Sequence, residues 1–119
     1  MPRPSAAARL ASYERSYHEA ARAVAQIGFI SAGSLVRRST RCGTASCHCH
    51  ADPPQLHGPY YQWTAKLGGK TVTRRLSEAE ARIYKEWIAN DRKLRARIRR
   101  MRAIAAKAAP LILDVAVSG

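Results

Sequence analysis

Residues 60–80 read YYQWTAKLGGKTVTRRLSEAE and predict a β-hairpin followed by a helix. Two runs rich in β-branched and aromatic residues flank Gly68-Gly69, a pair typical of a two-residue hairpin turn with positive φ. Pairing Leu67 with Lys70 sets the register of the hairpin and places Arg74 opposite Trp63. One face of the hairpin is then apolar and consists of Tyr61, Trp63, Ala65, Leu67, Val72 and Leu76. The other face is polar and basic and consists of Tyr60, Gln62, Thr64, Lys66, Thr71, Thr73 and Arg75.

The hairpin is followed at once by a signal for the start of a helix. Ser77-Glu78-Ala79-Glu80 is a capping box, with Ser77 as the N-cap and Glu80 three residues later. The helix that it opens is expected to run to Ala109 and to be stopped by Pro110. At about 1.5 Å per residue, such a helix is roughly 45 Å long, which is more than a small compact domain needs. Its apolar positions follow helical spacing and are Ile83, Trp87, Leu94, Ile98, Met101, Ala105 and Ala108.

A second helix is predicted before the hairpin, over residues 5–27, with Gly28 just past its end. Its apolar residues recur every three or four positions, as in a coiled-coil seam, and are Leu10, Tyr13, Tyr17, Ala20, Val24 and Ile27. A hairpin alone is marginally stable, so either a third strand, for which residues 35–41 are the candidate, or a covering helix is needed. The sequence therefore predicts an α+β fold in four segments: an N-terminal coiled-coil-like helix (1–32), a module of loop and small antiparallel sheet (33–76), a long basic helix (77–109) and a tail (110–119).

The loop before the hairpin contains all three cysteines of the chain. Residues 42–50 read CGTASCHCH, and His57 follows. Thiols and imidazoles this close together are the ligands of a structural zinc ion, which prefers four tetrahedral nitrogen or sulfur donors. His48 and His50 compete for the fourth position. A catalytic zinc would need an open position and a nearby acid or base, and Asp52 is the only carboxylate in the segment. The expected ligands of a structural zinc are Cys42, Cys47, Cys49 and His57.

Basic residues dominate the charge of the chain, with 21 Lys and Arg against 8 Asp and Glu and a formal net charge of +13. That surplus favours a polyanionic partner. It is greatest in residues 91–102, DRKLRARIRRMR, where mutual repulsion disfavours a helix unless a polyanion or an acidic partner neutralises it. The residues expected to contact nucleic acid are Arg37, Arg38, Arg41, Lys66, Arg75, Arg92, Lys93, Arg95, Arg97, Arg99, Arg100 and Arg102.

Other features of the sequence argue against an enzyme, a membrane-spanning protein and a secreted protein. No nucleophile–base pair, phosphate-binding glycine loop or group of metal-binding carboxylates is recognisable, so no catalytic residues are expected. The longest stretch without a charged side chain, residues 23–36, is too short to cross a membrane. Charged residues also interrupt the start of the chain, where a secretory signal would be apolar. The expected location is the cytoplasm, at the nucleoid if the partner is DNA, where the cysteines stay reduced.

Five short strings form a further pattern: Gly33-Ser34-Leu35, Arg41-Cys42-Gly43, Cys47-His48-Cys49, His57-Gly58-Pro59-Tyr60-Tyr61 and Gly69-Lys70-Thr71. Together they resemble a family of small, basic bacterial and archaeal proteins of unknown function, over about residues 33–95. The resemblance supports His57 as the fourth ligand, because His48 and His50 lie outside the shared pattern. It also implies an association with mobile elements. At the level of fold, the order of hairpin, capping box and helix is similar to the arm-type DNA-binding domain of tyrosine recombinases.

These observations predict a non-enzymatic, zinc-stabilised protein that binds nucleic acid, DNA rather than RNA, as an accessory to a mobile-element or recombination machine. The alternative is a protein–protein adaptor, whose helix seams bind a helical partner and whose basic surface binds an acidic protein. No membrane partner is expected. The two seams also predict a homodimer, because the longer basic helix would extend beyond its partner helix in the same chain and leave apolar side chains uncovered.

Overall fold

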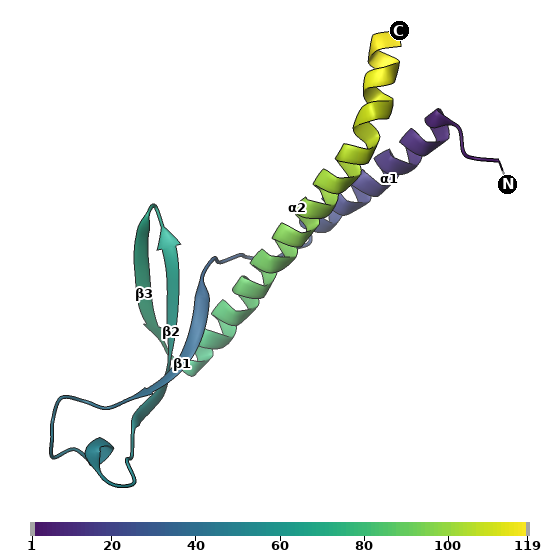
Figure 1. The fold of residues 1–119 in the computed structure, drawn as a ribbon. Coiled ribbons are helices and arrows are strands. Elements are labelled where there is room, and N and C mark those ends of the chain that lie inside the picture. Colours follow the sequence, from purple (N-terminus) through teal and green to yellow (C-terminus); the bar gives the residue numbers. More distant parts are fainter. Residues whose placement is uncertain (1, 119) are drawn as a thin grey trace. The chain divides into compact units, whose positions relative to one another are not determined.

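The computed structural model describes residues 2–118 (Figure 1). Its elements are helix α1 (Ala6–Val24), strand β1 (Ser34–Thr40), a short 3₁₀ helix η1 (His48–His50), strands β2 (His57–Leu67) and β3 (Lys70–Leu76), and helix α2 (Glu78–Ser118). The predicted α+β class is confirmed. The chain forms two units. One is Phe29–Ala89, with the sheet, η1 and the first turns of α2; the other contains α1 and the rest of α2, from Asn90 onward.

The sheet has the strand order β1-β2-β3, and both strand pairs are antiparallel. The hairpin has the predicted register, in which Leu67 pairs with Lys70. The turn residues Gly68 and Gly69 have φ of 56° and 79°, a left-handed backbone that favours glycine. The third strand predicted over residues 35–41 is confirmed as β1, shifted by one residue, and it pairs with the other edge of β2.

Strand β2 begins at His57, three residues earlier than predicted. Gly58 and Pro59 argue against a strand at this point, because proline cannot donate a hydrogen bond to a neighbouring strand. The structure accommodates them at an irregularity: the pairing of β1 with β2 is regular up to Arg38, shifts, and resumes where Thr40 pairs with His57. The two strands therefore stay joined as far as the loop that contains the cysteines.

The apolar face of the sheet packs against the first turns of α2. Four side chains form the buried core: Trp63, Ala65, Leu76 and Ile88. The Trp63 ring lies against Tyr84, with 5.1 Å between the ring centroids, and its indole N–H donates to the carbonyl of Ala32 at 2.9 Å. Ile83 was predicted on the apolar stripe of the helix, but it is 47% exposed. That assignment is wrong because Ala81, Tyr84 and Ile88 form the covered side of these turns.

Helix α2 begins with the predicted capping box. The Ser77 N–H donates to Glu80 Oε1 at 3.0 Å, and the Glu80 N–H donates to Ser77 Oγ at 3.2 Å. Two backbone N–H groups at the helix start are thereby satisfied within one turn. The direction of the chain out of the sheet is thus set by residues next to the hairpin itself.

Helix α2 does not end at Ala109 but continues through Pro110 to Ser118, so the predicted stop is wrong. A proline removes one hydrogen bond and bends a helix, while the turns on either side keep their own hydrogen bonds. Figure 1 shows α2 changing direction near its yellow end. Beyond the proline, Ile112 and Leu113 line a groove together with Tyr13 and Tyr17 of α1, and both remain largely exposed.

The two predicted helix seams meet within one chain. Tyr13 and Tyr17 of α1 line a groove of about 350 Å³ together with Ile104 and Ala108 of α2. Within the unit that contains α1, Ala20 of α1 and Ala108 of α2 are buried apolar residues. This pairing covers part of both seams inside the chain, and the homodimer stays a prediction.

Helix α1 ends at Val24 and not at Ile27 as predicted. The backbone N–H groups of the next three residues bond three residues back, so the chain continues in 3₁₀ turns as far as Ile27. Gly28 does not have the positive φ of a helix-ending glycine. A Cβ atom there would lie 3.2 Å from the side-chain amide of Asn90, so glycine allows α2 to pass closely.

Candidate metal centre and basic surfaces

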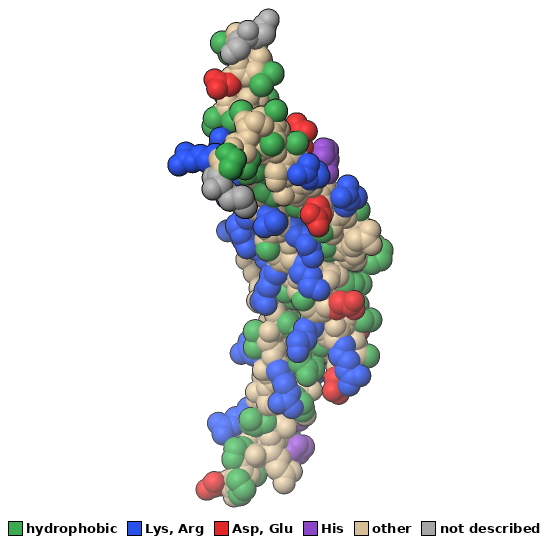
Figure 2. Space-filling model, turned by 90° about the vertical axis from the view of Figure 1, so that its right-hand side faces the viewer, with side chains coloured by type: hydrophobic (Ala, Val, Ile, Leu, Met, Phe, Trp, Pro, Cys, Tyr) green, Lys and Arg blue, Asp and Glu red, His purple; other side chains and the backbone are tan. Residues whose placement is uncertain are grey.

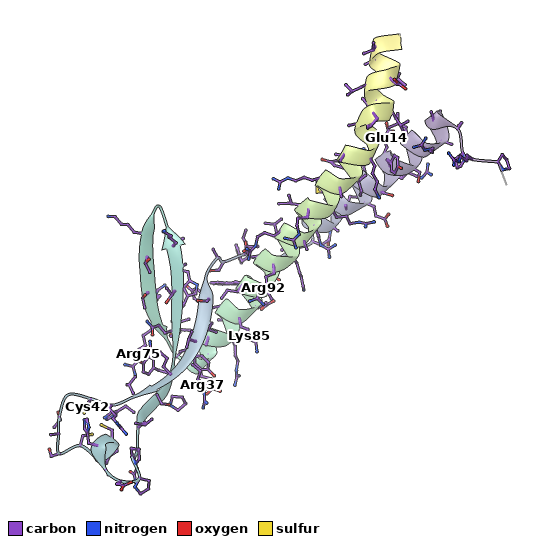
Figure 3. The ribbon with its side chains drawn as sticks, in the orientation of Figure 1. Glu14, Arg37, Cys42, Arg75, Lys85 and Arg92 are labelled. Atoms are coloured by element: carbon purple, nitrogen blue, oxygen red, sulfur yellow. The ribbon has the colours of Figure 1, made fainter. Side chains whose placement is uncertain are left out.

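Four side chains that can bind a metal come together where β1 ends and β2 begins (Figure 3). Cys42 follows β1, and His57 is the first residue of β2, where it pairs with the last residue of β1. Cys47 is the residue before η1, and Cys49 is within η1. Residues 41–56, here called the metal loop, are therefore closed at their ends by strand pairing and folded back in their middle by η1.

The ligand atoms of these four residues, here called the Cys3His cluster, all lie within 4.8 Å of one another. The sulfurs of Cys42 and Cys49 are 3.6 Å apart, and the Cys47 sulfur is 3.2 Å from His57 Nε2. A tetrahedral zinc ion with Zn–S of about 2.3 Å and Zn–N of about 2.0 Å separates its ligands by about 3.5–3.8 Å. Cys49 has no exposed surface and the other three are half-buried. The cluster is a potential metal site with four protein ligands.

The structure brings His57, and neither of its competitors, into the cluster. His48 is exposed, its Nδ1 is 3.9 Å from the Cys47 sulfur, and its ring lies beside that of His57. His50 is also exposed, and its Nε2 is 2.6 Å from the carbonyl oxygen of Cys42. His50 thus contacts the backbone of a ligand residue and leaves the centre of the cluster to the imidazole of His57.

The environments of the two neighbouring thiols are different. A hydrogen bond with the Thr44 backbone and another with His57 lower the pKa of Cys42 from 9.0 to about 6. Burial raises the pKa of Cys49 above 9.0, although its sulfur accepts the Cys42 backbone N–H at 3.3 Å. Without a cation, the negative charge therefore resides on Cys42, and Cys49 keeps its proton at neutral pH. A bound cation would favour the charged form of both thiols.

We expect zinc affinity to rise with pH, because zinc must displace the proton of Cys49. One displaced proton changes the affinity about tenfold per pH unit, and we expect at least this slope between about pH 6 and pH 8. Below about pH 6 the slope should steepen, since Cys42 then also becomes protonated. Competition with a chromophoric chelator at several pH values measures this dependence. An affinity independent of pH above pH 6 would contradict the assignment of Cys49 as a ligand.

The basic residues predicted on the strands are divided between the two faces of the sheet. Arg37 pairs with Tyr61 and lies on the face that packs on α2, whereas Arg38 lies on the opposite, exposed face. Figure 3 labels Arg37 on β1 and Arg75 on β3, whose register also places it on the exposed face. Arg41 is an exposed residue of the metal loop. The exposed sheet face consists of Val36, Arg38, Tyr60, Gln62, Thr64, Lys66, Thr71, Thr73 and Arg75.

Tyr60 and Gln62 also lie on the exposed sheet face, beside the basic residues that were predicted to contact nucleic acid. Arg38 Nη1 donates to Gln62 Oε1 at 3.1 Å. The Arg75 guanidinium lies over the Tyr60 ring, 4.0 Å from its centroid. The alternation of residues along the hairpin places Tyr60 and Gln62 on the polar face. Their pairing with Arg38, however, depends on the register of β1, which no local pattern determines.

The basic side chains of residues 92–102 of α2, here called the basic run, have few acidic partners. Arg95 forms an ion pair with Asp91 at 2.9 Å. Arg97 is half-buried, and its Nε is buried without a hydrogen-bond partner. Figure 2 shows Lys and Arg side chains crowded on the viewed face, with few Asp and Glu among them. Within residues 2–118, the exposed members whose side chains have no hydrogen bond or ion pair are Arg92, Lys93, Arg99, Arg100 and Arg102.

Among residues 2–118, no helix has both the length and the apolar character that a membrane span requires.

Comparison with known proteins identifies one family. The model of a family described as a domain of unknown function, DUF6788, matches residues 11–85. The matched segment contains the whole Cys3His cluster and all three strands, and it ends before the basic run. No curated protein and no solved structure matches the chain.

Proposed function

Because the chain belongs to the DUF6788 family, whose function is unknown, we propose a function from its own residues. The protein is non-enzymatic, is stabilised by a structural zinc ion, and binds nucleic acid, DNA in preference to RNA. The proposal has two parts, the metal and the polyanion, and each part is supported by different residues.

The Cys3His cluster supports a structural role for the metal. Three thiolates and one imidazole are soft ligands that suit Zn²⁺ better than Mg²⁺ or Ca²⁺. Four protein ligands fill a tetrahedral shell and leave no open position for a substrate or a reactive water. The metal loop has a single buried side chain, Cys49, so a metal would supply the stability that an apolar core supplies elsewhere.

The observation that carries nucleic-acid binding is the basic run of α2. Five of its exposed basic side chains have no carboxylate partner, and neighbouring like charges on a helix cost free energy in the isolated helix. A phosphate backbone removes that repulsion and releases its own counterions. Both effects make the free energy of binding more favourable. DNA is preferred to RNA because a β-ribbon fits the major groove of B-DNA, whereas the major groove of A-form RNA is too narrow for it.

A salt titration tests the proposed function. We expect the zinc-loaded protein to bind a mixed-sequence DNA duplex at about 50 mM salt. The logarithm of the association constant should fall with the logarithm of the salt concentration with a slope of about −4.5 or steeper, since at least five unpaired basic residues are available. Fluorescence anisotropy at several salt concentrations measures the slope. Undetectable binding at low salt, or a slope near zero, would exclude nucleic acid as the partner.

The groove between α1 and the later turns of α2 favours a second candidate, in which the seams bind another helix. Leu113 at its edge is 62% exposed, and Ile112 is 48% exposed. Covering such side chains contributes about 1.5–3 kcal/mol each when they become fully buried. We expect a second copy of this chain to be the partner, and light scattering at micromolar concentration should give the mass of a dimer. A monomer mass both with and without DNA would contradict the dimer.

A further inference from the structure

The exposed sheet face has two arginines whose guanidinium groups are held in place. Gln62 accepts a hydrogen bond from Arg38 at 3.1 Å, and the Tyr60 ring lies 4.0 Å under the guanidinium of Arg75. The register brings the two pairs together, because Arg38 is opposite Tyr60 and Gln62 is opposite Arg75. The four side chains therefore form one contiguous cluster across all three strands, here called the arginine cluster.

The contacts within the arginine cluster leave its recognition groups free. A stacked guanidinium uses its flat face and keeps its N–H edges available, as Arg75 does over Tyr60. Gln62 uses its carbonyl oxygen toward Arg38, so its amide N–H groups remain donors. None of the three strands contains an Asp or Glu, and no carboxylate of the sheet therefore competes for these donors.

The hairpin continues beyond β1 as a ribbon of two strands. β1 reaches Thr64 of β2 at its first residue, whereas the pairing of β2 with β3 goes on to Leu67 and Lys70. The exposed side of this ribbon is lined by Thr64, Lys66, Thr71 and Thr73, and the hydroxyls of Thr64 and Thr73 are 3.5 Å apart. Neighbouring strands are about 4.8 Å apart, so a two-stranded ribbon fits the major groove of B-DNA, which is about 12 Å wide.

The arginine cluster differs physically from the basic run of α2. Holding a long side chain in one orientation costs conformational entropy, and that cost is already met in the free protein for Arg38 and Arg75. Binding to the phosphate backbone requires only positive charge. The arginines of the basic run that have no hydrogen bond or ion pair supply this charge. A guanidinium that is held in one orientation binds most strongly to a pair of acceptors at a fixed spacing. The N7 and O6 atoms of guanine are such a pair.

We propose that the exposed sheet face enters the major groove of duplex DNA and reads base sequence, while the basic run binds phosphates without reading sequence. This inference rests on the proposed function and specifies its ligand. Arg38 and Arg75 contact guanine edges, the amide of Gln62 contacts adenine, and the threonine methyl groups of the ribbon contact thymine methyl groups. The protein then has a preferred duplex that contains guanines, and its preference depends on the sheet alone.

Selection from a library of DNA duplexes with a randomised central segment tests the inference. We expect the full zinc-loaded chain to enrich a defined sequence. The specificity ratio is the affinity for that duplex divided by the affinity for a scrambled duplex of the same composition. Arg38→Lys and Arg75→Lys keep the charge and lose the planar fork, so each should lower this ratio by about 5- to 150-fold. Affinity for the scrambled duplex and the salt slope should not change.

Matched variants separate base reading from folding and from simple charge. Arg99→Lys in the basic run makes the same chemical change and should leave the specificity ratio unaltered. Tyr60→Leu removes the ring under Arg75 and should lower the ratio while the arginine itself remains. Zinc content and the circular dichroism spectrum show whether each variant is folded, and a misfolded Tyr60→Leu protein is replaced by Tyr60→Phe, which keeps the ring and should keep the ratio.

The outcomes separate this inference from the proposed function. Binding to duplex DNA with steep salt dependence but no enriched sequence overturns base reading and leaves the proposed function standing. An unchanged ratio in both Arg→Lys variants also overturns it. A preference for RNA over duplex DNA, or no binding to DNA at low salt, overturns the inference together with the proposed DNA partner.

Discussion

The Cys49→Ser protein should lose its metal and the ordered structure of the metal loop. Cys49 is the buried member of the Cys3His cluster, and its sulfur is 3.6 Å from that of Cys42. Serine is a hard, neutral oxygen donor at neutral pH and cannot replace a thiolate on zinc. We expect zinc affinity to fall by at least about 1,000-fold, with about one zinc per chain in the parent protein and almost none in the variant.

Loss of zinc from Cys49→Ser should also change the folding of the unit that contains the sheet. Residues 41–56 have short turns but only one buried side chain, so without a metal they should exchange amide protons rapidly. The hairpin and its Trp63 core should persist, because the buried side chains of this core all lie outside the metal loop. Elemental analysis gives the metal content, and hydrogen exchange gives the protection of each segment.

Histidine variants provide the matched controls for the metal centre. His57→Ala removes a ligand of the cluster and should release zinc, whereas His48→Ala removes an exposed imidazole and should retain it. His50→Ala should also retain the metal, with at most a modest loss of affinity, since His50 contacts only the carbonyl of Cys42. Full zinc retention in His57→Ala would show that another residue is the fourth ligand.

Removing the charge of the exposed, unpaired basic residues in the basic run should abolish most of the affinity for nucleic acid. The variant replaces five exposed residues with glutamine: Arg92, Lys93, Arg99, Arg100 and Arg102. Each phosphate contact contributes about 0.9 to the salt slope of B-DNA binding, so the slope should become shallower by about 4 to 5. Affinity at about 50 mM salt should fall by at least about 100-fold. Anisotropy titrations of both proteins with the same duplex measure both quantities.

A charge-conserving control accompanies this neutral variant. Replacing the same four arginines with lysine keeps the charge and should retain most of the affinity and the salt slope. Glutamine has a helix propensity close to that of arginine, so both variants should keep the helical content of α2. If the glutamine variant binds with an unchanged slope, the phosphate contacts lie elsewhere on the chain.

Local sequence determined the hairpin and the start of α2. The Gly68-Gly69 pair accepts the two positive φ angles of a tight turn, and the alternation around it permits one register with one apolar face. The register that pairs Leu67 with Lys70 follows from the turn residues and from this alternation. The three thiols of the metal loop were also predictable, because they lie within eight residues of sequence. Each of these features depends on neighbours along the chain.

Features that depend on partners distant in sequence are visible only in the folded chain. His57 joins the cysteines because β1 and β2 pair across the metal loop, and β1 is too short and irregular in pattern to reveal that pairing. The same register places Arg38 beside Gln62 and turns Arg37 to the other face of the sheet. Helix α2 passes through Pro110 because a proline removes one hydrogen bond while the turns on either side of it keep their own. Sequence patterns report the preferences of neighbouring residues. Contacts between separate segments of the chain, such as the pairing of β1 with β2, form only when the chain folds.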